Sequence, residues 1–152
     1  MKVFEISKCI ESGSWLEGHI EDNDVRFRIR LLGFGKVDLN EIESEEECSF
    51  DLSEGVLWIL FLEVVNLTKS NVSCDDIKRY LRLVDADECR YDIVEDAYIC
   101  QNSEFAEKTR LKRFYYSEFK PKMKATGAVL FLVPDEETIY SIGIESGRIK
   151  EV

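Results

Sequence analysis

One stretch of the chain limits its possible folds more than any other. Between residues 25 and 31 apolar and charged side chains alternate strictly, with Val25, Phe27, Ile29 and Leu31 separated by Arg26, Arg28 and Arg30. Successive side chains of a β-strand point to opposite faces, so one face of this segment is apolar and the other cationic. The pattern predicts a half-buried strand. The turn-rich residues 21–24 before it extend the prediction to a hairpin over residues 14–31.

A second segment, from Val56 to Leu67, is apolar on both faces. A central strand of a sandwich has this composition, and a buried helix is the competing interpretation. Val64 and Val65, followed by a polar cluster, favour the strand. Further strands are predicted over residues 3–10, 36–40, 89–93, 128–133, 138–144 and 148–152. Residues 75–84 fit either a short helix that starts near Ser73 or a strand from Tyr80 to Val84.

Many short strands at short spacing, without repeated alternation of strand and helix, predict an all-β sandwich or barrel with possible short helices. The chain has 152 residues, of which 45% are hydrophobic and 11% aromatic. It is therefore long and apolar enough to bury a core. No Pro/Gly-rich linker divides it, so a single domain over residues 1–152 is expected.

The formal net charge of −11 argues against nucleic acid as a general partner, because Lys and Arg contacts with phosphates dominate that affinity. The longest apolar run, residues 56–62, is too short to span a bilayer, which predicts no membrane partner. The first residues lack a signal-peptide pattern, and the five cysteines are odd in number without a CxxC pair. Together these features predict a cytoplasmic protein with unpaired thiols.

From Val56 onward the order of features resembles a bacterial immunoglobulin-like domain family of unknown function, common in Gram-positive lipoproteins. The resemblance covers about residues 56–145. Its features are the strand ending in Val64-Val65-Asn66, the segment 81–87 with Tyr91 after it, the run 127–134 ending in Val133-Pro134, and residues 139–142. The resemblance implies an immunoglobulin-like β-sandwich and brings no catalytic residues with it.

No motif in the sequence indicates an enzyme. His19 is the single histidine, which leaves one candidate for any triad, and no Gly-x-Ser-x-Gly turn is present. Gly33-Phe34-Gly35 lacks the third glycine of a dinucleotide fingerprint. Asp85, Asp87 and Glu88 lack the remainder of a calcium loop, so a hairpin turn is the expected role. The sequence therefore predicts no catalytic residue, metal or cofactor. A hydrolase with an unfamiliar carboxylate or cysteine site stays open.

Charge is unevenly distributed along the chain. Residues 41–54 carry seven acidic side chains and no basic one, and residues 108–124 are rich in bases and aromatics. The basic stretch fits single-stranded nucleic acid, a protected edge strand or internal pairing with the acidic segments. The acidic stretch fits docking on a basic protein. Its candidate partner-binding residues are Glu43, Glu45, Glu46, Glu47, Asp51 and Glu54.

These features lead to a non-enzymatic protein-binding module. In its sharpest form it is an immunity protein that neutralises a basic toxin, often a nuclease, through this acidic surface. The alternative is a structural or envelope-associated immunoglobulin-like domain. The oligomeric state is left open.

Overall fold

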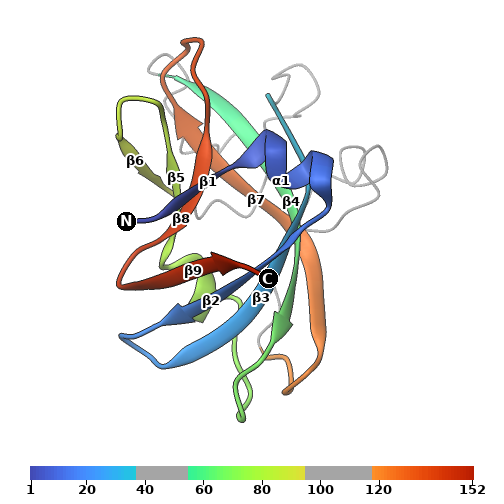
Figure 1. The fold of residues 1–152 in the computed structure, drawn as a ribbon. Coiled ribbons are helices and arrows are strands. Elements are labelled where there is room, and N and C mark those ends of the chain that lie inside the picture. Colours follow the sequence, from blue (N-terminus) through green and yellow to red (C-terminus); the bar gives the residue numbers. More distant parts are fainter. Residues whose placement is uncertain (37–54, 95–117) are drawn as a thin grey trace, which may run out of the picture.

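The computed structural model describes residues 1–36, 55–94 and 118–152, which form two antiparallel β-sheets (Figure 1). One sheet has the spatial order β1 (Val3–Glu5), β8 (Ser141–Ile144), β5 (Leu81–Val84) and β6 (Arg90–Asp92). The other has the order β7 (Lys124–Val133), β4 (Val56–Asn66), β3 (Val25–Lys36), β2 (Trp15–Ile20) and β9 (Gly147–Glu151). The described residues also form two short helices, α1 (Ile6–Ser12) and α2 (Asp75–Lys78). The predicted all-β sandwich with short helices is confirmed.

The alternating segment 25–31 lies in β3, which forms the predicted hairpin with β2. β3 pairs with β2 in antiparallel register, with Gly18 opposite Phe27 and Ile20 opposite Val25. Phe27 and Ile29 are fully buried, whereas Arg26 and Arg28 are exposed. A register shift between Leu31 and Gly33 then leaves Leu32 exposed, which is the effect of a β-bulge.

β4 is the central strand that its two apolar faces predict, because it pairs with β3 on one side and β7 on the other. One face contributes Leu60, Leu62 and Val64 to the main core. The other face contributes Leu57 and Ile59 to a second, smaller cluster with Ala128 and Leu130 of β7.

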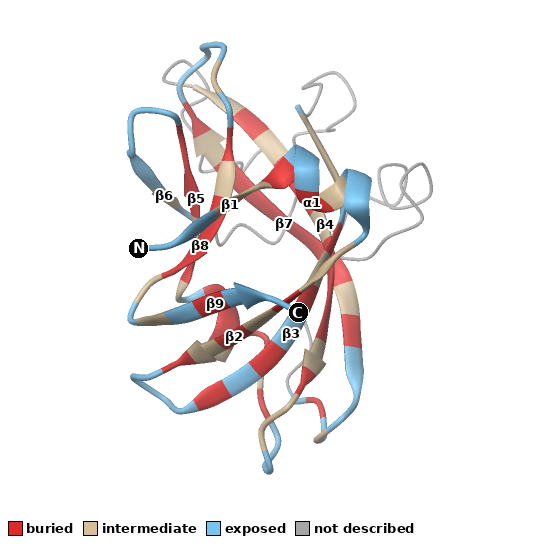
Figure 2. Ribbon diagram, viewed as in Figure 1, coloured by how far each residue is buried: buried red, intermediate tan, exposed pale blue. Residues whose placement is uncertain are grey.

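The main core lies between the two sheets, and buried residues alternate with exposed ones along the strands around it (Figure 2). An aromatic group joins the sheets at this core: the Phe34 and Trp58 rings stack with their centroids 4.7 Å apart, and Tyr140, next to β8, contacts both. Such aromatic contacts add to the stability gained from burial.

The strand predicted over residues 3–10 is wrong beyond Glu5, where α1 begins. Ile6 and Cys9 are buried three residues apart and Ile10 packs against the same core, which is helical spacing. Gly13, at φ 66°, ends the helix in the left-handed conformation that glycine adopts without strain. The strand predicted over 138–144 is shorter than expected and begins at Ser141.

Both interpretations of residues 75–84 are partly correct. Asp75–Lys78 forms the helix α2, with its two acids in the first turn, and Leu81–Val84 forms β5. The predicted turn follows: the Asp85 carboxylate accepts the backbone N–H groups of Asp87 and Cys89, each at 2.9 Å.

Residues 37–54 and 95–117 lie outside the described part of the chain. The predicted short strand from residue 37 onward and the acidic segment 41–54 therefore stay predictions, as does the single domain over 1–152. Within the described ranges, no helix has the length and apolar character needed to cross a membrane.

Candidate functional site

The outward face of β9, β2 and β3 carries cationic side chains in rows that cross the three strands. In one row Arg148 lies opposite His19, and His19 lies opposite Arg26. In the next row Lys150 lies opposite Glu17, and Glu17 lies opposite Arg28. Arg26, Arg28, Arg148 and Lys150 are exposed, because their strand neighbours Phe27 and Ile149 fill the core on the other side of the sheet. We call Arg26, Arg28, Arg148 and Lys150, with His19 and Glu17 between them, the basic face.

In a neighbouring row of the same sheet, the charged side chains are paired with one another. The Glu63 carboxylate, which is almost fully buried, forms ion pairs with Arg30 and with Lys124, the latter at 3.2 Å. The Arg30 guanidinium also lies over the Trp15 ring, 4.9 Å from its centroid. This row is therefore structural in character, since its charges already have partners.

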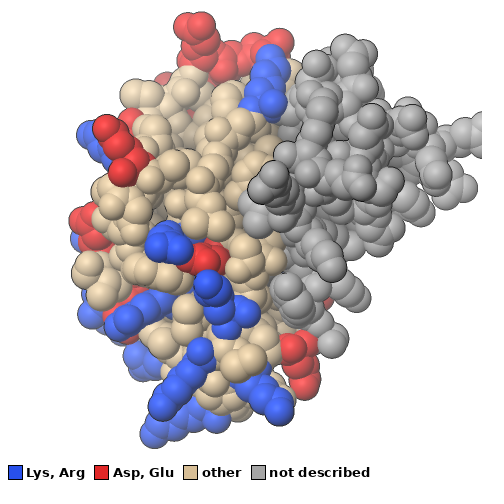
Figure 3. All heavy atoms as spheres, turned by 90° about the vertical axis from the view of Figure 1, so that its right-hand side faces the viewer, with Lys and Arg blue, Asp and Glu red and all other residues tan. Residues whose placement is uncertain are grey.

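Most cations of the basic face lack such partners. Arg148 contacts Glu21 at 3.6 Å, but Arg26, Arg28 and Lys150 make no ion pair with any residue in the described ranges. The chain as a whole carries a net charge of −11. A group of cations without ion-pair partners on one sheet therefore gives this part of the surface a charge opposite to that of the whole protein. Figure 3 shows Lys and Arg side chains gathered over the lower part of one side of the molecule, with few acids among them.

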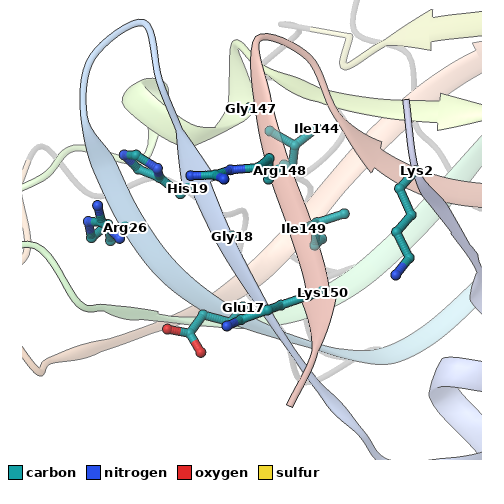
Figure 4. Close-up of a pocket in the computed structure, with 10 residues that line it drawn as sticks. All are labelled: Lys2, Glu17, Gly18, His19, Arg26, Ile144, Gly147, Arg148, Ile149 and Lys150. Atoms are coloured by element: carbon teal, nitrogen blue, oxygen red, sulfur yellow. The ribbon is translucent and has the colours of Figure 1, made fainter.

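A pocket of about 430 Å³ adjoins the basic face at β9. Ile144, Gly147 and Ile149 line it with apolar surface, and Lys2, Arg148 and Lys150 add positive charge. In Figure 4, Lys2 lies on one side of β9, and His19 and Arg26 lie on the other. The pocket therefore lies beside β9, the outermost strand of this sheet. Its lining also includes Ile144 of β8, which belongs to the other sheet.

His19 is a strand residue on the outer face of the sheet, within the hairpin predicted over residues 14–31. Its Nε2 atom is 2.8 Å from a carboxylate oxygen of Asp24 in the β2–β3 turn. This contact orients the imidazole along the hairpin.

The thiols in the described ranges do not resemble activated nucleophiles. Cys9 and Cys74 are buried and Cys89 is exposed. Burial raises the pKa of Cys9, and the neighbouring Asp85 carboxylate raises the pKa of Cys89. A higher pKa lowers the fraction of reactive thiolate at neutral pH. Over the same ranges, no three His, Cys, Asp or Glu side chains are grouped as ligands for a metal ion.

The predicted partner-binding residues Glu43, Glu45, Glu46, Glu47, Asp51 and Glu54 all lie in the range 37–54, outside the described residues. The acidic docking surface stays a prediction for that reason. Of the basic stretch 108–124, only its last part is described. There Phe119 is buried and bridges to Val72, and Lys124 pairs with Glu63.

The basic face was missed from sequence, although its signal is present. The alternation over residues 25–31 identifies three arginines on one face, and the shorter alternation Arg148-Ile149-Lys150 repeats it. Their adjacency depends on β2, which pairs with β3 on one side and β9 on the other. No local pattern specifies that arrangement.

Comparison with known proteins gives matches at the level of fold. No protein-family model and no curated protein matches the chain. The solved structure of MPT63, a secreted protein from Mycobacterium tuberculosis, has a TM-score of 0.53 at 12% identity, over 83% of this chain and 80% of that one. A conserved hypothetical protein from Bacillus anthracis has a TM-score of 0.54 at 13% identity, over 91% and 96%.

The predicted lipoprotein YcdA from Bacillus subtilis has a TM-score of 0.50 at 13% identity, over 83% of this chain. The match spans only 36% of YcdA. At such identities the likeness concerns the fold alone. The immunoglobulin-like family resemblance stays a prediction.

The cytoplasmic location predicted from the sequence needs correction. The structural neighbours include a secreted protein and a predicted lipoprotein, and this contradicts it. The prediction relied on the first residues and on the cysteine pattern.

Proposed function

We propose that this chain is a non-enzymatic protein-binding domain of the cell envelope or the extracellular space, and that it binds an acidic partner through its basic face. The observation that carries the proposal is the set of exposed cations Arg26, Arg28 and Lys150, which have no ion-pair partner within the described ranges. A surface of this kind attracts an oppositely charged protein and selects against a basic one.

The form of the surface also supports binding. The cations stand on three paired strands, so the sheet fixes the spacing of their backbone positions and little backbone freedom is lost when a partner docks. The location is supported by the secreted protein and the predicted lipoprotein among the structural neighbours.

The test is binding to poly-L-glutamate immobilised on a sensor surface, at low and at physiological salt. We expect the wild-type protein to bind, and added salt to weaken the binding because the charges are exposed. Replacing the three unpaired cations (Arg26→Gln, Arg28→Gln, Lys150→Gln) should weaken it by about tenfold or more, since each exposed charge pair contributes up to about 1 kcal/mol.

A matched control makes the same change of charge elsewhere. Lys8, Lys36 and Lys120 are exposed and lie outside the basic face, and Lys8 and Lys36 form exposed ion pairs with Glu5 and Asp135. Exposed ion pairs contribute little to stability, so replacement of the three lysines by glutamine should leave the affinity within about twofold. Equal losses of affinity in the two triple variants would show that only the net charge of the protein matters, and would contradict the proposal. Failure of the wild-type protein to bind poly-L-glutamate at low salt would contradict it as well.

A further inference from the structure

We propose that the free edge of β9 is a strand-addition site, which takes an extended segment of the partner with alternating acidic and apolar residues. This inference rests on the proposed function and specifies which part of the partner binds and in what conformation. In this form of recognition, backbone hydrogen bonds supply affinity and alternate side chains supply specificity.

The register of β9 determines which of its backbone groups face outward. The N–H of Val152 donates to the Trp15 carbonyl, and the N–H of Glu21 donates to the Ser146 carbonyl. Bonded and non-bonded residues alternate in an antiparallel pair, so Arg148 and Lys150 also direct their N–H and C=O groups toward β2. The backbone groups of Gly147, Ile149 and Glu151 then point away from β2.

Within the described part of the chain, these outward groups have no backbone partner. β9 is the last strand of its sheet, and no described residue forms a backbone hydrogen bond with Gly147, Ile149 or Glu151 on that side. The opposite edge of the same sheet differs, because the Val94 N–H donates to the Leu130 carbonyl of β7. The lining of the pocket of about 430 Å³ includes two of these residues, Gly147 and Ile149, together with Lys2 and Ile144 beyond β9.

The side chains beside the edge specify an alternating ligand. A residue that pairs with a strand residue directs its side chain to the same face as its partner. Positions opposite Arg148 and Lys150 therefore lie on the basic face and favour acids. The position between them lies opposite the buried Ile149, beside Ile144, and favours an apolar side chain. Lys2, across the pocket in Figure 4, adds a further cation.

A second copy of this chain fits the edge poorly. Two β9 strands can pair through their free edges with Ile149 opposite Ile149, Gly147 or Glu151 of the other copy. The first register places Arg148 opposite Lys150, and the other two place Arg148 opposite Arg148 or Lys150 opposite Lys150. Like charges directly opposite each other destabilise a sheet. Cationic edge strands are a known way to prevent such self-pairing, and the same cations favour an acidic partner.

The test is amide hydrogen exchange by NMR on the intact protein, with the acetylated and amidated peptide Ser-Glu-Val-Glu-Val-Glu-Ser as the probe. In the free protein we expect rapid exchange at Ile149 and Glu151 and slow exchange at Arg148 and Lys150. Saturating peptide should slow exchange at Ile149 and Glu151 by about tenfold or more, because these amides become hydrogen-bonded.

Two control peptides separate strand pairing from charge. In Ser-Glu-Pro-Glu-Pro-Glu-Ser the acids are kept, but the apolar positions lack the N–H that would donate to the Ile149 carbonyl. In Ser-Lys-Val-Lys-Val-Lys-Ser the N–H groups are kept and the charge is reversed. We expect each to bind at least about tenfold more weakly than the probe and to leave exchange at Ile149 unchanged.

The outcomes distinguish this inference from the proposed function. Binding of poly-L-glutamate or the probe without protection of Ile149 and Glu151 would overturn strand addition and leave the basic face as the binding surface. Absence of all binding would overturn both. Protection that rises with protein concentration before any peptide is added would show that a second copy occupies the edge, and would also overturn the inference.

Discussion

At the scale of single residues, the Asp85 side chain shows how one carboxylate organises a turn. It accepts two backbone N–H groups and, through its other oxygen, the Tyr91 hydroxyl at 3.0 Å. Burial and this hydrogen bond to the carboxylate raise the pKa of Tyr91 from 10.0 to about 12. The neutral phenol is thus the form that the folded state prefers.

This pKa predicts a loss of stability in alkali. A phenol with a folded-state pKa above its unfolded value contributes its stability fully below pH 10, and that contribution is lost as the pH rises toward about 12. We expect the free energy of unfolding in urea to fall more steeply over this range for the wild-type protein than for Tyr91→Phe, which has no phenol to ionise. Parallel pH profiles for the two proteins would contradict the assignment.

At the scale of elements, Asn66 shows how the end of a strand is fixed to two other segments. Asn66 ends β4 and is fully buried. Its Nδ2 donates to the carbonyl oxygens of Ser70 and Phe119, at 2.9 and 3.1 Å, and its Oδ1 accepts the Thr68 N–H. One side chain therefore closes the loop after β4 and holds the segment that leads into β7.

Removal of this side chain should be costly. Asn66→Ala leaves buried donors and acceptors without partners, which predicts a destabilisation of about 2–4 kcal/mol. Chemical denaturation followed by circular dichroism measures it. Asn71→Ala is the matched control, because Asn71 is exposed and makes one long contact to Glu118, and we expect a change within about 0.5 kcal/mol. Equal effects in the two variants would contradict the role given to Asn66.

At the scale of the whole molecule, the two sheets are joined by the aromatic group at the core. Phe34 of β3 and Trp58 of β4 belong to one sheet, and Tyr140 precedes β8 of the other. The Tyr140 ring lies edge-on to Phe34, with a centroid distance of 5.8 Å and an interplanar angle of 75°. Such contacts join residues that are far apart in the sequence, and they maintain the alignment of the two sheets.

Truncation of Tyr140 should therefore destabilise the whole sandwich. We expect Tyr140→Ala to lower the free energy of unfolding by about 3–5 kcal/mol, as loss of a buried aromatic side chain does. Tyr140→Phe keeps the ring and should cost less than about 1 kcal/mol. Urea denaturation measures both. A small effect of Tyr140→Ala would show that the sheets are held together elsewhere.

Much of the fold follows from local pattern. The alternation over residues 25–31 predicts β3 and both of its faces, and the two-sided apolar run from Val56 predicts a central strand. These predictions succeed because the period of the side chains is a property of the strand itself. They are less accurate at short elements: residues 6–10, predicted as part of a strand, belong to a helix, since a few apolar residues fit either period.

The candidate site could not be derived in the same way. The sequence alone determined that the side chains of Arg26 and Arg28 point away from the core. It also determined that Arg148 and Lys150 flank the apolar Ile149. Only the tertiary structure decided that β2 stands between β3 and β9, which brings cations from opposite ends of the chain into common rows. The physical reason is that strand pairing depends on long-range packing of the two layers. That packing also decided which strand lies at the edge of the sheet among the described residues, and the proposed strand-addition site depends on this edge.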